Sequence, residues 1–187
     1  MKLVETGGSP CTRLLVCLDL QRASLPDGVE TQRDTRRSIA NCSRVLAHAR
    51  EWDWSILHVH ARHPGDGWRS RPIEGLEPWA TEPVMTRAGL SAFANPSFRE
   101  LLRGADRAQL ILIGFSWSSS CLATVLSARD RGIAVTVVQD AMDDPQRSTG
   151  EADSLQGPAQ ILAAHFSRMV STDEFIGRPP LRLVASR

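Results

Sequence analysis

Residues 109–121 read QLILIGFSWSSSC, and this stretch decides the fold. It begins with QLILI, a short continuous apolar run that stops at Gly114, as is typical of a strand buried on both faces. Small polar residues follow, and a helix is predicted over about 119–131, with Gly132 in the C′ position that favours glycine. A buried strand that passes through a short turn into a helix is a repeating unit of parallel α/β sheets.

The same alternation of strand and helix runs along the rest of the chain. Further strands are predicted at 14–18, 55–61, 83–87, 133–138 and 169–171, and further helices at 31–51, 96–103 and 161–166. This order indicates a parallel sheet covered by helices on both faces. Residues 62–82 are rich in Pro, Gly and Trp and are predicted to form a long loop.

Length and composition bound the function. The 187 residues suit one domain, predicted over 13–176, with a flexible lead-in at 1–12 and a surface tail at 177–187. The 22 basic and 21 acidic residues leave a net charge of +1, which provides no positive field for nucleic acid or for an anionic membrane. No apolar run approaches the ~18–20 residues of a membrane span. The first residues lack the apolar core of a signal peptide, so we expect a cytoplasmic protein.

The four cysteines are predicted to be free thiols, because none forms a CxxC pair and a chain of this size needs no disulfides. They are Cys11, Cys17, Cys42 and Cys121. The single lysine is Lys2, so a cation in a catalytic site must be an arginine unless the N-terminal segment supplies it.

Ligands of parallel sheets bind at the carboxyl ends of the strands, which directs attention to the residue types found there. Cys121 follows strand 109–113 and is predicted to lie in the first turn of the next helix. The helix dipole favours a thiolate at that position and would lower the pKa of the thiol. Free N–H groups at the helix start could hold an oxyanion. The alternative is a small buried cysteine with a structural role only.

Two charged residues end other predicted strands. Asp19 follows the first strand, where its carboxylate could accept a proton from a nearby thiol, or could merely cap a turn. Arg87 ends the third strand and stays charged at any working pH. It could therefore stabilise an anion but not transfer protons, and the alternative role is a surface salt bridge.

These residues lie in segments that resemble the motifs of the isochorismatase-like cysteine hydrolases, the family of nicotinamidases and N-carbamoylsarcosine amidohydrolases. The segments LDLQ (18–21), MTR (85–87) with LSAF (90–93), the stretch from Gly114 to Cys121 with LAT after it, and VVQDA (137–141) resemble four family motifs in order. The resemblance covers about residues 13–175.

The resemblance implies a three-layer α/β/α fold with a mostly parallel six-stranded sheet. It also implies a hydrolase of amide, lactam or ureido C–N bonds in small molecules, acting through a thioester. Cys121 would be the nucleophile, Asp19 the general base and acid, and Arg87 the charge stabiliser. A cis peptide bond is expected within Ser116–Ser118, beside the oxyanion hole. Relatives are usually dimers or tetramers, so a homodimer or homotetramer is expected.

Two departures from the family pattern keep other functions open. Arg87 stands where the family has lysine, and the spacing from Gly114 to Cys121 is one residue longer than the family pattern. The chain could therefore be a non-hydrolytic relative, either a pseudoenzyme or a binding subunit. It could also be an acid-catalysed isochorismatase-type or lyase-type enzyme that uses Asp19 without a covalent step.

Candidate substrate-binding residues complete the prediction. They are Gln21, Phe93, Trp117 and Ser120. Trp117, with Trp68 and Trp79 in loops, would suit a flat or aromatic small molecule.

Histidines on and after the second strand raise the question of a metal, because some relatives bind a zinc-class ion in this region. The histidines here are His58, His60 and His63, but the Asp-x-His pattern of those relatives is absent. We therefore expect no metal and no cofactor.

Overall fold

The structure is a computed structural model that describes residues 13–25, 33–62, 67–103, 108–144 and 153–177. The predicted lead-in at 1–12 lies outside the described residues, as does the predicted tail after Gly177. No helix among the described residues is long and apolar enough to cross a lipid bilayer.

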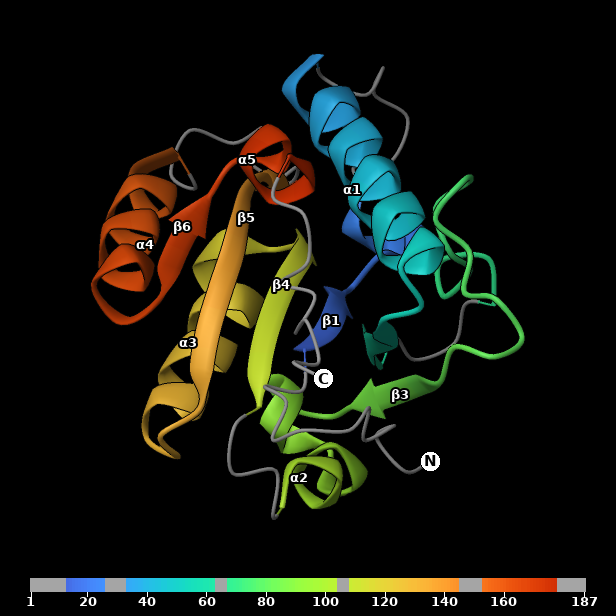
Figure 1. Cartoon of the computed structure of the whole chain (residues 1–187). Helices are drawn as coiled ribbons and strands as arrows, with labels where there is room; N and C mark the ends of the chain where they lie inside the picture. Colours follow the sequence, from blue (N-terminus) through green and yellow to red (C-terminus); the bar gives the residue numbers. More distant parts are fainter. Residues whose placement is uncertain (1–12, 26–32, 63–66, 104–107, 145–152, 178–187) are drawn as a thin grey trace, which may run out of the picture.

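The sheet has six strands, and every pair of neighbours is parallel, which confirms the predicted fold class. The strands are β1 (Arg13–Leu18), β2 (Ser55–Ala61), β3 (Val84–Arg87), β4 (Gln109–Phe115), β5 (Ala134–Asp143) and β6 (Arg168–Val170). Their order across the sheet is β3-β2-β1-β4-β5-β6, so the order reverses between β1 and β4 (Figure 1).

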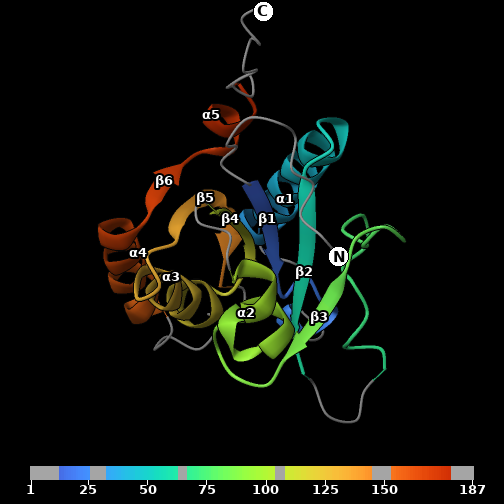
Figure 2. The ribbon, with the colours of Figure 1, turned by 60° about the horizontal axis from the view of Figure 1, so that its bottom comes forward.

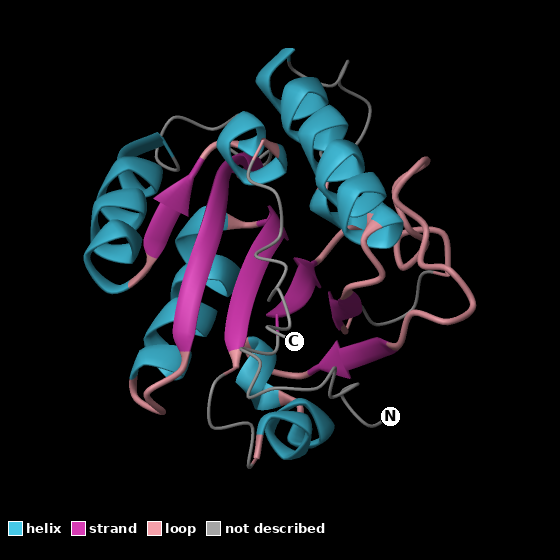
Figure 3. Ribbon diagram, viewed as in Figure 1, coloured by secondary structure: helices cyan, strands magenta, loops and turns pink. Residues whose placement is uncertain are grey.

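Helices cover both faces of the sheet (Figures 2 and 3). One layer holds α1 (Arg33–Glu51) and α5 (Thr172–Ile176), and the other holds α2 (Pro96–Leu102), α3 (Leu122–Arg129) and α4 (Asp153–Phe166). Shorter turns are η1 (Arg22–Ser24), η2 (Ala92–Ala94) and the π-helical turn η3 (Trp117–Cys121). The result is the expected three-layer α/β/α arrangement.

The central strand β1 shows why continuous apolar runs form these strands. Leu14, Val16 and Leu18 pack among side chains of α2, α3 and α4, whereas Leu15 and Cys17 pack on the side of α1. All five are fully buried. Each buried Leu or Val stabilises the fold by about 1.5–3 kcal/mol, so a strand with two apolar faces anchors both helix layers.

Near the C-terminus, the structure lengthens one predicted strand and adds one helix. β5 was predicted to end at residue 138 but continues to Asp143, because it bulges opposite β4 and then resumes pairing, with Phe115 opposite Asp143. The short helix α5 was not predicted. Its first residue, Thr172, donates its backbone N–H and its hydroxyl to the Asp140 carboxylate at 2.7 and 2.8 Å. Asp140 on β5 therefore holds the N-terminal end of α5 against the sheet.

Gly114 lets the end of β4 approach the end of β1 backbone to backbone. It pairs with Leu18, has φ +123°, and a Cβ there would overlap the Leu18 carbonyl oxygen. Both the backbone conformation and the space therefore require glycine. This contact sets the residues after β4 beside the residues after β1.

A buried ionic cluster fastens the end of α1 to β2 and to the chain before β3. The Glu82 carboxylate accepts from Arg50 at 2.7 and 2.9 Å, contacts His58 Nε2 at 2.9 Å and accepts the Trp79 N–H at 3.0 Å. Burial would raise the pKa of Glu82, but these hydrogen bonds outweigh it and lower the pKa to about 2. Burial lowers the pKa of His58, so this histidine is neutral at pH 7.

We predict that Gly114→Ala destabilises the protein by at least about 3 kcal/mol, because it combines a strained φ with a backbone overlap. The matched control is Gly132→Ala, which also has a positive φ of +68° but has nothing within 4 Å of the new Cβ. The control should cost only about 1 kcal/mol. Urea unfolding of the three proteins measures both differences, and equal losses would contradict the argument from close approach.

We also predict that Glu82→Gln lowers the free energy of unfolding at pH 7 by about 2–4 kcal/mol, because it leaves Arg50 without its buried partner. The folded pKa of about 2 lies below the unfolded value, so this stabilisation exists above about pH 4.3 and is lost toward pH 2. The difference between wild type and variant should therefore shrink as the pH falls. Glu74→Gln, at an exposed site, is the control and should change little.

Candidate functional site

Asp19 lies at the carboxyl end of β1 in the left-handed backbone region, with φ +50°. Asp tolerates this conformation better than most side chains. Its N–H donates to the Val59 carbonyl at 3.0 Å, and its Oδ1 accepts the Ala61 N–H at 2.6 Å. The Asp19 carboxylate, which the sequence predicts as an acid–base group after the first strand, is thus held against the end of β2.

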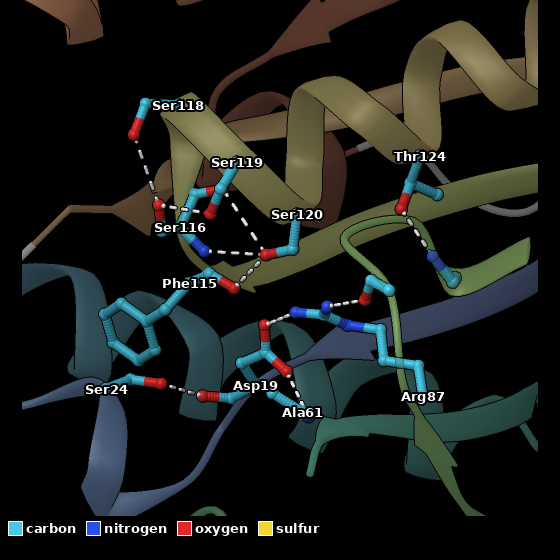
Figure 4. Close-up of polar contacts among 12 residues, drawn as sticks. Asp19, Ser24, Ala61, Arg87, Phe115, Ser116, Ser118, Ser119, Ser120 and Thr124 are labelled. Carbon is cyan, nitrogen blue, oxygen red and sulfur yellow. Dashed lines mark hydrogen bonds and ion pairs between the residues drawn. The ribbon is translucent and has the colours of Figure 1, made fainter. Parts of the chain in front are cut away.

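Arg87 forms an ion pair with Asp19 from the end of β3 (Figure 4). Its Nη2 donates to Asp19 Oδ2 and its Nη1 donates to the Gly89 carbonyl. The Arg87 side chain is 7% exposed and the Asp19 side chain 9%. Each charge is therefore compensated mainly by the other and little by water. A lysine has a single nitrogen and lacks the planar fork that lets Arg87 reach both partners.

The segment between β4 and α3 carries Cys121, and we call residues 115–121 the Cys121 turn. A cis peptide bond joins Phe115 to Ser116, immediately before the stretch Ser116–Ser118 in which it was expected. A π-helical turn follows, in which the Cys121 N–H donates to the Ser116 carbonyl at 2.9 Å. A π turn has one residue more than an α turn, so it takes up the extra residue noted in the sequence.

Serine side chains fix the inside of the Cys121 turn (Figure 4). The buried Ser120 hydroxyl donates to the Phe115 carbonyl at 2.7 Å and accepts the Ser116 N–H at 2.9 Å. The hydroxyls of Ser116 and Ser119 lie 3.1 Å apart. Ser120, predicted to bind substrate, therefore bonds to the backbone of its own turn.

Cys121 is fully buried, and its surroundings raise the pKa of its thiol, whereas the sequence predicts that the pKa is lowered. Burial raises the pKa of the Cys121 thiol, and the negative charge of Asp144 raises it further. The expected lowering by the helix dipole is wrong, because Cys121 lies inside the packed core and α3 begins one residue later. Within the described ranges, no hydrogen bond or ion pair joins the thiol to Asp19 or Arg87. The thiol is protonated at neutral pH.

Sequence reasoning missed two buried carboxylates at the end of β5. Asp144 Oδ2 accepts the Ser118 N–H at 2.9 Å, and Asp143 accepts the Asp144 N–H at 2.8 Å and the Thr35 hydroxyl at 2.6 Å. The signal was the pair of aspartates after an apolar strand, but the predicted strand ended too early to include them. They lie beside the Cys121 turn because β5 continues past its bulge.

The remaining predicted substrate contacts are buried. Gln21 Nε2 donates to the Ser70 carbonyl at 3.4 Å and so connects the chain after β1 to the loop between β2 and β3. Phe93 packs edge-on against Phe98, and Trp117 is fully buried in the same core. Their contact with substrate stays a prediction.

The loop tryptophans and the histidines have other neighbours. Trp68 and Trp79 are half exposed, beneath the guanidinium groups of Arg22 and Arg50. His58 Nε2 forms a hydrogen bond with the Glu82 carboxylate, and His63 lies outside the described residues. The described part of the chain holds no group of three side chains able to bind a metal ion.

Comparison with known proteins shows which family this chain matches. A family model described as the Isochorismatase domain matches residues 13–172. Enterobactin synthase component B of Escherichia coli K12 is 27% identical over 111 residues, which are 59% of this chain and 37% of that protein. The match thus spans little more than a third of that relative's length.

Solved structures share the whole fold. An isochorismatase from Pseudomonas putida KT2440 is 26% identical with a TM-score of 0.76, over 88% of this chain and 90% of that one. A cysteine hydrolase from Pseudomonas syringae has a TM-score of 0.73 at 21% identity, over 95% and 96% of the two chains, and shows the likeness of fold alone. With a family model that covers nearly all of the described residues, this chain belongs to the isochorismatase family of hydrolases.

Proposed function

We propose that the protein is a cysteine hydrolase that cleaves an amide, lactam or ureido C–N bond of a small molecule through a thioester. The observation that supports this most is the buried Asp19–Arg87 ion pair, which lies at the carboxyl ends of the strands, beside the Cys121 turn. β1 and β4 are neighbours whose ends pair Leu18 with Gly114, so the acid–base group and the nucleophile follow adjacent strand ends.

The protonation state of Cys121 sets the first step of the proposed reaction. Because burial keeps the pKa of the thiol high, the sulfur must lose its proton as it attacks the substrate carbonyl. Asp19 accepts that proton and passes it to the nitrogen when the C–N bond breaks. Water then hydrolyses the thioester, with Asp19 as base. Arg87 holds the Asp19 carboxyl group in place, and its positive charge compensates the carboxylate before and after these proton transfers.

The oxyanion of the tetrahedral intermediate would be met by backbone N–H groups of the Cys121 turn. Three of these groups are already used, since Cys121 donates to Ser116, Ser118 donates to Asp144 and Ser116 donates to the Ser120 hydroxyl. The remaining N–H groups at the start of the turn are the candidates. A small-molecule substrate, a homodimer or homotetramer and a cytoplasmic location stay proposals that rest on the family resemblance.

A second candidate is acid-catalysed cleavage of the isochorismatase type, with Asp19 as the acid and no covalent step. The observation that favours it is the fully buried, protonated thiol of Cys121, which has no bonded base among the described residues. The two candidates need different residues, so one variant separates them.

We predict that Cys121→Ala abolishes C–N hydrolysis, because the thioester cannot form, and that Asp19→Asn lowers kcat by at least about 10²-fold. Ammonia release from nicotinamides and ureido acids, and formation of the ring-opened amino acid from lactams, measure the rate. Intact-protein mass after acid quench detects the acyl-enzyme. Cys42→Ala, which removes a buried thiol on the opposite face of the sheet, is the matched control. Turnover that survives Cys121→Ala would support acid catalysis instead.

We predict that Arg87→Lys lowers kcat/KM by about tenfold, because lysine cannot hold Asp19 and the Gly89 carbonyl together. The control is Arg103→Lys, since the Arg103 side chain is 76% exposed and pairs with Glu100. Steady-state rates of the three proteins at one pH make the comparison. A higher rate in Arg87→Lys would mean that the native arginine marks a site that has lost its hydrolytic function.

A further inference from the structure

We infer that Asp144 is a positioning residue for the nucleophile: its carboxylate holds the Ser118 N–H and so fixes the turn that carries Cys121. The inference deepens the proposed function and rests on it in one respect, since it takes Cys121 as the reacting group. It concerns a residue outside the Asp19–Arg87–Cys121 set.

The first support is the hydrogen bond itself. Asp144 Oδ2 lies 2.9 Å from the nitrogen of Ser118, the second residue of the π-helical turn. An N–H in the first turn of a helix has no intrahelical acceptor, so a side chain must satisfy it if water is excluded. Asp144 is 8% exposed, and a charged acceptor in such a place forms a strong hydrogen bond.

The second support is that Asp144 is itself held in place. Its N–H donates to Asp143 Oδ1 at 2.8 Å, and Asp143 Oδ2 accepts the Thr35 hydroxyl of α1 at 2.6 Å. Asp143 also pairs with Phe115, the first residue of the Cys121 turn. A continuous path of hydrogen bonds and strand pairing therefore links α1, β5 and the turn. A side chain anchored in this way can fix a backbone direction.

The third support is electrostatic. Among the described residues, Asp144 is the charged group that acts on the Cys121 thiol, and its negative charge adds to burial in raising the pKa of that thiol. An anchor with a neutral acceptor would hold Ser118 without this effect. The charge thus adds to the effect of burial and favours the protonated form of the Cys121 thiol.

Two variants of the full-length protein separate the hydrogen bond from the charge. Asp144→Asn keeps an oxygen acceptor for Ser118 but removes the charge, and Asp144→Ala removes both. The matched control is Asp140→Asn, on the same strand, which loses a charge but keeps its oxygen for Thr172. Two measurements are made on each protein: amide exchange of Ser118 by NMR, and the rate of Cys121 alkylation by iodoacetamide between pH 7 and 10.

In Asp144→Ala the Ser118 amide should exchange at least about tenfold faster, because a charge-assisted hydrogen bond is lost. In Asp144→Asn the Ser118 amide should stay protected, while the alkylation profile moves to lower pH. At a fixed pH Cys121 should then react at least about threefold faster, which corresponds to half a pKa unit. Asp140→Asn should change neither measurement.

The inference is overturned if Ser118 exchange is unchanged in Asp144→Ala, or if the Cys121 profile of Asp144→Asn coincides with that of Asp140→Asn. Should Asp144→Ala fail to fold, the more conservative Asp144→Asn decides alone through its alkylation profile. Neither measurement uses a substrate. An absence of hydrolysis in wild type would therefore overturn the proposed function while leaving this test intact.

Discussion

The structure of the site depends on one close approach, where the backbone of Gly114 meets the carbonyl of Leu18. Any side chain at position 114 would push β4 away from β1 at their carboxyl ends. With glycine there, β1 and β4 stay paired up to Leu18 and Gly114, at the point in the sheet where the strand order reverses. Asp19 and the Cys121 turn then follow adjacent strands whose ends are in register. The chemistry proposed for this edge rests on that spacing, because a proton can pass only between groups that lie close together.

Burial is the second constraint, and it acts differently on each charged or ionisable group. Asp19 and Arg87 form an ion pair in a site less than a tenth exposed, where each charge compensates the other. Glu82 is held ionised by Arg50 in the same way, on the side of α1. Cys121 has no such partner among the described residues, and burial with the field of Asp144 keeps its thiol protonated. Among these groups, the charge therefore resides in the Asp19–Arg87 pair, whereas the Cys121 thiol is neutral.

The two departures from the family pattern have structural explanations. The extra residue before Cys121 becomes part of a π turn, so Cys121 stays at the start of α3 and the added length is absorbed locally. Arginine in place of lysine gains a second anchor, since Arg87 reaches both Asp19 and the Gly89 carbonyl. Both features make the turn and the ion pair more firmly held by their surroundings. They are compatible with a retained hydrolase and also with a site that has shifted to acid catalysis.

The sequence by itself determined the fold class and the strand ends at which Asp19, Arg87 and Cys121 lie. Those features follow from local apolar runs and from the rule that parallel strands end at one edge. Only the tertiary structure decided the protonation of Cys121, because the pKa of a thiol depends on burial and on charges distant in sequence, such as Asp144. It also decided that β5 extends past its bulge, since strand length there depends on pairing with β4 and not on local hydrophobicity. Long-range contacts are absent from a one-dimensional pattern, and they set the electrostatics of this site.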